Sequence, residues 1–241
     1  MRGKTIALMA ALAGVLVAAA IIIPRDWVVS VFEGAPSSLQ TTNSAGRRGA
    51  YYLPSSYASR PLPLLVALHG TGTGGDAMVR TFRKLAAEKE FIIVAPDSRS
   101  LDGWEVGNHR GEVTPDFEHA LACINELESM PNVRIDPTHV LVAGLSAGGS
   151  SAVYYATNND MFTAFAVLHG GVIHGSIGPH GVRGWFSTGE DDTVRSPAAV
   201  RAAEDYASHE LLTEDLQMKT FPGGHALTDT EMRALVEWWL Q

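Results

Sequence analysis

The sequence holds one cysteine, no long run of lysine or arginine, and no internal repeat. A single cysteine, Cys123, cannot form an internal disulfide, so the fold depends on its apolar core. Hydrophobic residues make up 46% of the 241 positions, which is enough for one large domain. The formal net charge of -8 offers no attractive field to a phosphate backbone, and this argues against nucleic acid as a partner.

The histidines show no arrangement typical of a metal site. His119 and His209 fall in helical patterns, while His169, His174 and His180 share one glycine-rich connection. None of them forms a pair with the spacing of metal ligands. We therefore expect no metal ion and no cofactor.

One long apolar run lies near the N-terminus, from Thr5 to Ile23, with positive charge before it. A helix of this length would just cross a bilayer core of about 30 Å. We predict that residues 1–26 form an uncleaved membrane anchor; the alternative is a cleaved signal peptide, since Ala18–Ala20 provides small residues for cleavage. In either case the rest of the chain is expected outside the cytoplasm, anchored to the membrane or secreted.

Residues 27–48 are polar and rich in turn formers, which predicts a tether to a domain spanning residues 49–241. In that domain short apolar runs alternate with amphipathic stretches, a pattern typical of an α/β fold with a mainly parallel sheet and helices on both faces. The expected strands are 64–68, 91–95, 140–143, 165–168, 182–187 and 216–221; the expected helices are 76–89, 116–130, 147–157, 197–212 and 228–240. Ligands of such sheets bind beyond the carboxyl ends of the strands, so the site is expected in the loops that follow them.

A serine stands at the sharpest of these strand ends, in the sequence G-L-S-A-G from Gly144 to Gly148. A buried strand pattern precedes it and a helical pattern follows it, which is the context of a nucleophile elbow. Small residues on both sides of Ser146 would let the strand and the helix approach closely. The motif therefore predicts Ser146 as a nucleophile.

The loop after the strand 64–68 reads H-G-T-G-T-G-G and allows two interpretations. Gly70, Gly72 and Gly75 match a dinucleotide-binding G-x-G-x-x-G, with Asp97 near the position of a ribose-binding acid. Alternatively, the loop shapes an oxyanion hole from the backbone N–H groups of Thr71 and Ala147. We favour the oxyanion hole, because it joins two loops into one site, whereas the dinucleotide interpretation leaves Ser146 unexplained.

A nucleophilic serine needs a base and an orienting acid, because its free hydroxyl is barely reactive at neutral pH. Both follow Ser146 in the sequence: the strand 182–187 leads to the acid loop Glu190-Asp191-Asp192, and the strand 216–221 leads to P-G-G-H. The glycine-rich loop would let His225 swing across the strand ends, so His225 is the predicted base. The three adjacent carboxylates leave the acid open at this point.

The loop from Pro96 to Gly111 has no hydrophobic period and should form one wall of the site. Trp104 is its one large apolar side chain. It either lines the substrate pocket or packs the loop onto the core, and we consider it a candidate substrate-binding residue.

Taken in order, G-L-S-A-G, L-H-G-T-G-T-G-G, G-E-D-D-T-V and P-G-G-H resemble an α/β-hydrolase serine esterase. The most similar branch is the group of polyhydroxyalkanoate depolymerases, feruloyl esterases and small carboxylesterases. The resemblance implies an α/β-hydrolase fold without a substantial lid, and a triad of Ser146, Asp192 and His225. Asp192 stands three positions beyond Gly189, where the acid of this family usually lies, and the β-branched residues after it would also anchor it.

The predicted activity is hydrolysis of small-molecule carboxylic esters through an acyl-enzyme. A peptidase or thioesterase would use the same triad, since a triad does not specify the bond that is cleaved. Two alternatives come from other classes: a dinucleotide-binding protein, and an anchored binding protein without catalysis.

Overall fold

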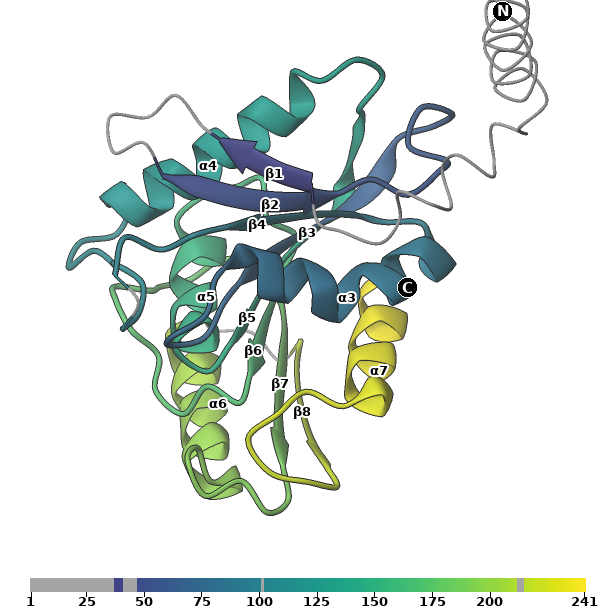
Figure 1. Ribbon diagram of the computed structural model, residues 1–241. Helices are drawn as coiled ribbons and strands as arrows, with labels where there is room; N and C mark the ends of the chain where they lie inside the picture. The colour runs from purple at the N-terminus through teal and green to yellow at the C-terminus, as the bar shows by residue number, and fades with distance from the viewer. Residues whose placement is uncertain (1–36, 41–46, 101, 212–214) are drawn as a thin grey trace, which may run out of the picture. The chain divides into compact units, whose positions relative to one another are not determined.

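The computed structural model describes residues 37–40, 47–100, 102–211 and 215–241 (Figure 1). These residues belong to the unit that runs from Pro36 to Gln241. The predicted anchor, residues 1–26, lies outside the described residues. Within the described ranges, no helix has both the length and the apolar character needed to cross a bilayer.

The described chain forms an eight-stranded sheet in the order β1-β2-β4-β3-β5-β6-β7-β8. β1 pairs with β2, and β2 pairs with β4, both in antiparallel fashion. All pairings from β4 to β8 along this order are parallel. The strands are β1 (Ser37–Gln40), β2 (Arg48–Tyr52), β3 (Leu62–Leu68), β4 (Ile92–Pro96), β5 (Ile135–Leu145), β6 (Ala164–Leu168), β7 (Arg183–Gly189) and β8 (Leu216–Phe221). The prediction of a mainly parallel sheet is confirmed.

The described residues form five helices, which cover both faces of the sheet (Figure 1): four connect parallel strands, and the last one follows β8. They are α3 (Gly75–Lys89), α4 (Pro115–Glu128), α5 (Ala147–Thr157), α6 (Pro197–Leu211) and α7 (Asp229–Trp239). Apolar residues of α4, α5 and α6 pack on one face, and those of α3 and α7 pack on the other. All five helices lie within two residues of the predicted ranges at either end.

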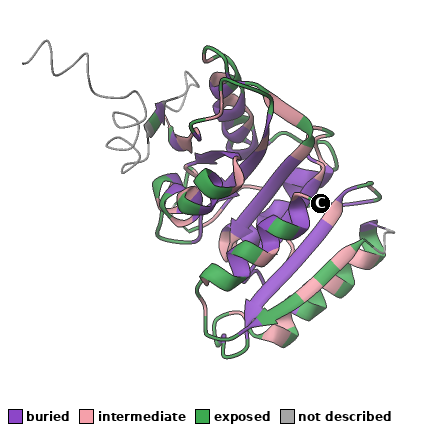
Figure 2. Ribbon diagram, turned by 90° about the vertical axis from the view of Figure 1, so that its right-hand side faces the viewer, coloured by how far each residue is buried: buried purple, intermediate pink, exposed green. Residues whose placement is uncertain are grey.

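Alternate residues of the central strands feed these two cores. Leu64, Val66 and Leu68 of β3 contribute to the core under α5, whereas Leu65 and Ala67 contribute to the core under α3. Both sets are fully buried, which explains why the sequence shows unbroken apolar runs rather than an alternation. Figure 2 shows the buried central strands beside the edge strand β8, whose residues are mostly exposed or half-buried.

The sheet begins earlier in the chain than the sequence predicts. Residues 37–40, which fall in the predicted tether, form β1 and pair with β2, and the Leu39 side chain is buried in the core. This antiparallel edge has no helix crossover, so the alternation that reveals the parallel strands gives no signal here. The folded part of the chain therefore includes a segment before Gly49.

Candidate active site

Ser146 lies at the turn between β5 and α5, as the sequence predicts. Its backbone has a φ of 55° and a ψ of -112°, a region that L residues rarely adopt. The Ser146 amide donates to the Leu168 carbonyl at 2.8 Å, so the neighbouring strand β6 holds the strained residue in place. The strain turns the side chain out of the sheet at its carboxyl edge, which is the geometry of a nucleophile elbow.

The glycines around Ser146 are needed because backbone segments meet there. A Cβ atom on Gly144 would lie 2.1 Å from the carbonyl carbon of Gly148, and one on Gly148 would lie 2.4 Å from the Leu68 carbonyl oxygen. No side chain fits at these distances, so α5 can begin directly over β3 and β5 only with glycine at both positions.

Three polar side chains join at this edge of the sheet in one line of hydrogen bonds. The His225 Nε2 atom lies 3.0 Å from the Ser146 Oγ atom, and the His225 Nδ1 atom lies 2.8 Å from the Asp192 Oδ2 atom. The three residues follow β5, β7 and β8; β5 and β7 flank β6, and β8 pairs with β7 in the parallel part of the sheet. The structure thus brings together all three side chains of the predicted triad.

Asp192 differs sharply from the two acids before it. Its side chain is fully buried, while Glu190 and Asp191 are exposed. The Asp192 Oδ1 atom accepts hydrogen bonds from the amides of Val194 and Arg195, each at 2.8 Å. Burial alone would raise the pKa of Asp192, but hydrogen bonds from these two amides and from two histidines hold that pKa well below its usual range. Asp192 is therefore an ionised, rigidly held partner for His225.

The loop that carries Asp192 and the loop that carries His225 pack closely against each other at Gly189 and Gly223. A Cβ atom on Gly189 would lie 2.2 Å from the Gly223 carbonyl oxygen, so the two loops meet backbone to backbone. The Asp191 amide donates to the same carbonyl at 2.9 Å. Gly223 itself has a φ of 117°, which favours glycine. These contacts fix the separation of Asp192 and His225.

Both residues of the predicted oxyanion hole belong to segments that lie beside the serine. Ala147 is the first residue of α5, where a backbone N–H has no acceptor within the helix. Thr71 follows Gly70, and a Cβ atom on Gly70 would lie only 3.4 Å from the Ser146 Cβ atom. The loop that carries Thr71 therefore passes directly beside the nucleophile.

Of the two alternatives for Trp104, the structure shows that it packs its loop onto the core, since only 8% of its surface is exposed. Its Nε1 atom donates to the His69 carbonyl at 2.8 Å, and its ring contacts the rings of His69 and Tyr155. The Thr71 hydroxyl donates to the Asp102 carbonyl at 3.1 Å from the other side. Trp104 therefore braces the loop that precedes Thr71.

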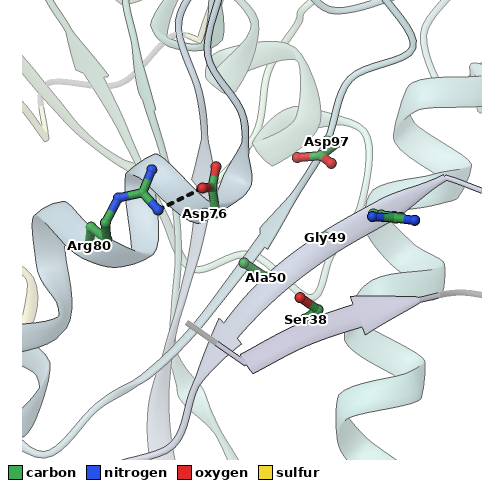
Figure 3. Close-up of a pocket in the computed structure, with 7 residues that line it drawn as sticks. Ser38, Gly49, Ala50, Asp76, Arg80 and Asp97 are labelled. Atoms are coloured by element: carbon green, nitrogen blue, oxygen red, sulfur yellow. Dashed lines mark hydrogen bonds and ion pairs between the residues drawn. The ribbon is translucent and has the colours of Figure 1, made fainter. Parts of the chain in front are cut away.

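The structure disfavours the dinucleotide interpretation of the glycine loop. The Asp97 Oδ1 atom accepts from the Gly75 amide at 2.7 Å and so occupies the N-terminus of α3, where a pyrophosphate would bind. The cavity beside it has a volume of about 290 Å³ and is lined by both Asp76 and Asp97 (Figure 3). Arg80, which lines the same cavity, is paired with Asp76 at 2.6 Å. Two carboxylates at this end would repel a phosphate.

The one cluster of metal-type ligands in the described ranges overlaps the triad at Asp192 and His225. One ligand atom each from His169, Asp192 and His225 lies within 4.8 Å of the others. However, the Asp192 Oδ2 atom is 2.8 Å from the Nδ1 atoms of both histidines. Two ligands of a tetrahedral zinc ion lie about 3.3 Å apart, since each is about 2.0 Å from the metal. The spacing fits hydrogen bonds better than shared coordination.

Sequence reasoning missed two buried residues behind the triad, His169 and Glu231. His169 contacts Asp192, and Glu231 contacts His169 from the first turn of α7. One signal for His169 was available, because it directly follows the apolar run of β6 and so falls at the carboxyl edge of the sheet. Glu231 gave no such signal, since an acid in the first turn of a helix is ordinary.

Comparison with known proteins gives one family and several relatives. A family model described as putative esterase matches residues 44–202. The chain is 31% identical over 136 residues to putative esterase NocK of Nocardia uniformis subsp. tsuyamanensis, covering 52% of this chain and 39% of that protein. It is 31% identical over 142 residues to poly(3-hydroxyalkanoate) depolymerase C of Paucimonas lemoignei, covering 54% of this chain and 33% of that protein. The chain thus spans well under half the length of each of these relatives.

Among solved structures, acetyl xylan esterase from Aspergillus awamori matches with a TM-score of 0.66 at 18% identity. The match covers 84% of this chain and 98% of that one. With the sheet order described above, this likeness shows that the chain has the α/β-hydrolase fold.

Proposed function

The chain belongs to the family described as putative esterase, and from this we propose that it hydrolyses carboxylic esters through an acyl-enzyme on Ser146. The observation that carries the proposal is the unbroken line of hydrogen bonds from Ser146 through His225 to the buried carboxylate of Asp192. A structural role alone would require neither the strained serine nor a histidine placed between a hydroxyl and an ionised acid.

The chemistry follows from the positions of these atoms. The His225 Nε2 atom takes the proton of the Ser146 hydroxyl as the oxygen attacks the ester carbonyl carbon. The amides of Thr71 and Ala147 stabilise the resulting oxyanion. The bond to the alcohol then breaks, and His225 gives its proton to the leaving oxygen. Asp192 orients the ring and stabilises its charged form during both transfers.

Deacylation repeats these steps with water. His225 removes a proton from a water molecule, which attacks the acyl carbonyl carbon and forms a second oxyanion in the same pair of amides. When the bond to Ser146 breaks, its oxygen recovers the proton from His225, and the carboxylic acid leaves. The complete cycle consumes one ester and one water molecule and forms one carboxylic acid and one alcohol.

The test is a panel of substrates together with active-site labelling. We expect the purified protein to hydrolyse soluble short-chain esters faster than peptide or thioester analogues, and a fluorophosphonate to modify Ser146 in a peptide identified by mass spectrometry. Faster cleavage of peptides or thioesters would move the proposal to that class. Label on another residue, or hydrolysis of none of the panel, would refute the proposed function.

We expect no activation at lipid–water interfaces. The connection between β6 and β7, residues 169–182, contains no helix or strand and is too short to form a folded lid. The rate should therefore rise smoothly with the concentration of a long-chain ester through its solubility limit. A sharp rise at that limit would show that the site is covered in solution and opens at a surface.

We also propose that residues 1–26 act as a membrane anchor that places the hydrolase outside the cytoplasm, because a positively charged start precedes an apolar run of spanning length. Deleting residues 1–26 should release a soluble protein with unchanged turnover. A longer deletion, of residues 1–46, provides the control. It also removes the buried Leu39 side chain of β1 and should cost about 2 kcal/mol of stability. If the shorter deletion abolishes the folded thermal transition, the apolar run packs within the fold.

A further inference from the structure

His169 is a second histidine on the acid of the triad. It is the first residue after β6, it is fully buried, and its φ of 54° is positive, like that of Ser146 directly after the adjacent strand β5. The His169 amide donates to the Ser187 carbonyl at 2.7 Å, which extends the ladder between β6 and β7. Its Nδ1 atom lies 2.8 Å from the Asp192 Oδ2 atom, the same oxygen that contacts His225.

The other side of the His169 ring faces a second buried acid. The Nε2 atom of His169 lies 3.2 Å from the Glu231 Oε2 atom, and the Ser187 hydroxyl donates to Glu231 Oε1 at 2.6 Å. Thr228 and Glu231 have the spacing of a capping box, and the Thr228 hydroxyl does accept from the Glu231 amide. The Glu231 side chain, however, is buried beneath the helix start, with 1% of the residue exposed.

These contacts limit the number of protons on His169. An ionised carboxylate can only accept hydrogen bonds, so a ring that contacts one on each side must donate from both nitrogens. A ring with two N–H groups is an imidazolium. Burial opposes this charge, but hydrogen bonds to Glu231 and Asp192 outweigh it and raise the pKa of His169 above its ordinary value.

We propose that His169 is a positioning residue of the active site, which as a buried cation between Asp192 and Glu231 holds the triad acid and sets the charge that His225 experiences. This proposal rests on the proposed function. The titratable groups that face the ring in the described chain are Asp192 after β7, Glu231 on α7 and His225 after β8. His169 does not contact the reacting atoms, and it acts through Asp192.

The charges predict how the pH profile responds. With His169 charged, the sum over His169, Asp192 and Glu231 is one negative charge beside His225, whose ring centre lies 5.4 Å from that of His169. Glu231→Gln removes one negative charge and disfavours protonation of His225. The amide oxygen of the new side chain can still accept from the His169 ring, while its NH₂ group faces Ser187.

We therefore expect Glu231→Gln to move the acid limb of the pH profile of kcat/KM to lower pH, by on the order of half a pH unit to one pH unit. Adding His169→Asn should return the limb toward its original position, because the cation is removed as well. Asparagine suits this position, since it tolerates a positive φ and can place an NH₂ group near the original Nδ1 atom. Glu237→Gln, an exposed change on the same helix, is the matched control and should move nothing.

Two results would overturn the proposal: an acid limb that stays in place in Glu231→Gln, or a shift that persists in the double variant. A purely structural role would lower kcat or the unfolding temperature without moving the limb.

A second readout does not depend on turnover: in the inactive Ser146→Ala protein, nitrogen NMR should show two ring N–H groups on His169 at neutral pH, with both signals absent in His169→Asn. One N–H group would refute the charge assignment, whereas failure of the proposed function would leave this measurement unchanged.

Discussion

Replacing Ser146 by alanine is expected to lower kcat for ester hydrolysis by about 10⁶-fold and to abolish labelling by a fluorophosphonate. The change removes the nucleophile and leaves its base, acid and oxyanion donors in position. Within the described residues the Ser146 hydroxyl hydrogen-bonds with His225 Nε2, so its loss should not disturb packing. The unfolding temperature should therefore remain close to that of the unchanged protein, which thermal denaturation followed by circular dichroism would check.

Ser150→Ala is the matched control for this experiment. Ser150 lies on the same helix, α5, and its buried hydroxyl has no hydrogen-bond partner in the described part of the chain. Its removal should leave both turnover and labelling near their original values. If Ser146→Ala retained most of the activity, hydrolysis would have to occur at another group, and the elbow would be only a tight turn.

The sequence predicted the parallel part of the sheet well, because the central strands β3, β4, β6 and β7 are buried on both faces. Such strands appear as continuous apolar runs separated by helical periods. The edge strand β8 and the helix α5 also have the bounds that the sequence indicated. β5 proved longer than predicted, since Asp136 and Pro137 interrupt its apolar pattern. β1 and β2 carried no comparable signal, because each is short and antiparallel and lies at one side of the sheet.

The predicted site residues that the structure brings together are those that stand shortly after a strand end. Ser146, Asp192 and His225 each follow a strong strand pattern, and a parallel sheet necessarily brings such positions to one edge. Trp104 could not be assigned, because its role depends on contacts with His69 and Tyr155 that are distant in the sequence. The pairing of His169 with Glu231 could not be predicted for the same reason: it joins residues 62 positions apart, and neither belongs to a catalytic motif.

Replacing Asp192 by asparagine is expected to keep the fold and lower turnover by up to about 10⁴-fold. The amides of Val194 and Arg195 both donate to Oδ1, so the amide oxygen of the new side chain must take that place. Its NH₂ group then faces the Nδ1 atom of His225. To accept from it, the ring must carry its proton on Nε2, and in that tautomer it cannot take the proton of Ser146.

Stability should change together with activity in Asp192→Asn. Native partners lower the pKa of Asp192, so its ionised form stabilises the fold above about pH 4, and this contribution is lost as the pH falls through the lowered pKa. The variant lacks the contribution at neutral pH, and its unfolding temperature should fall there. Asp191→Asn is the matched control, since that side chain is exposed and should affect neither quantity. If Asp191→Asn were the crippled variant and Asp192→Asn nearly normal, the acid of the triad would be one residue away and the loop geometry described here would be wrong.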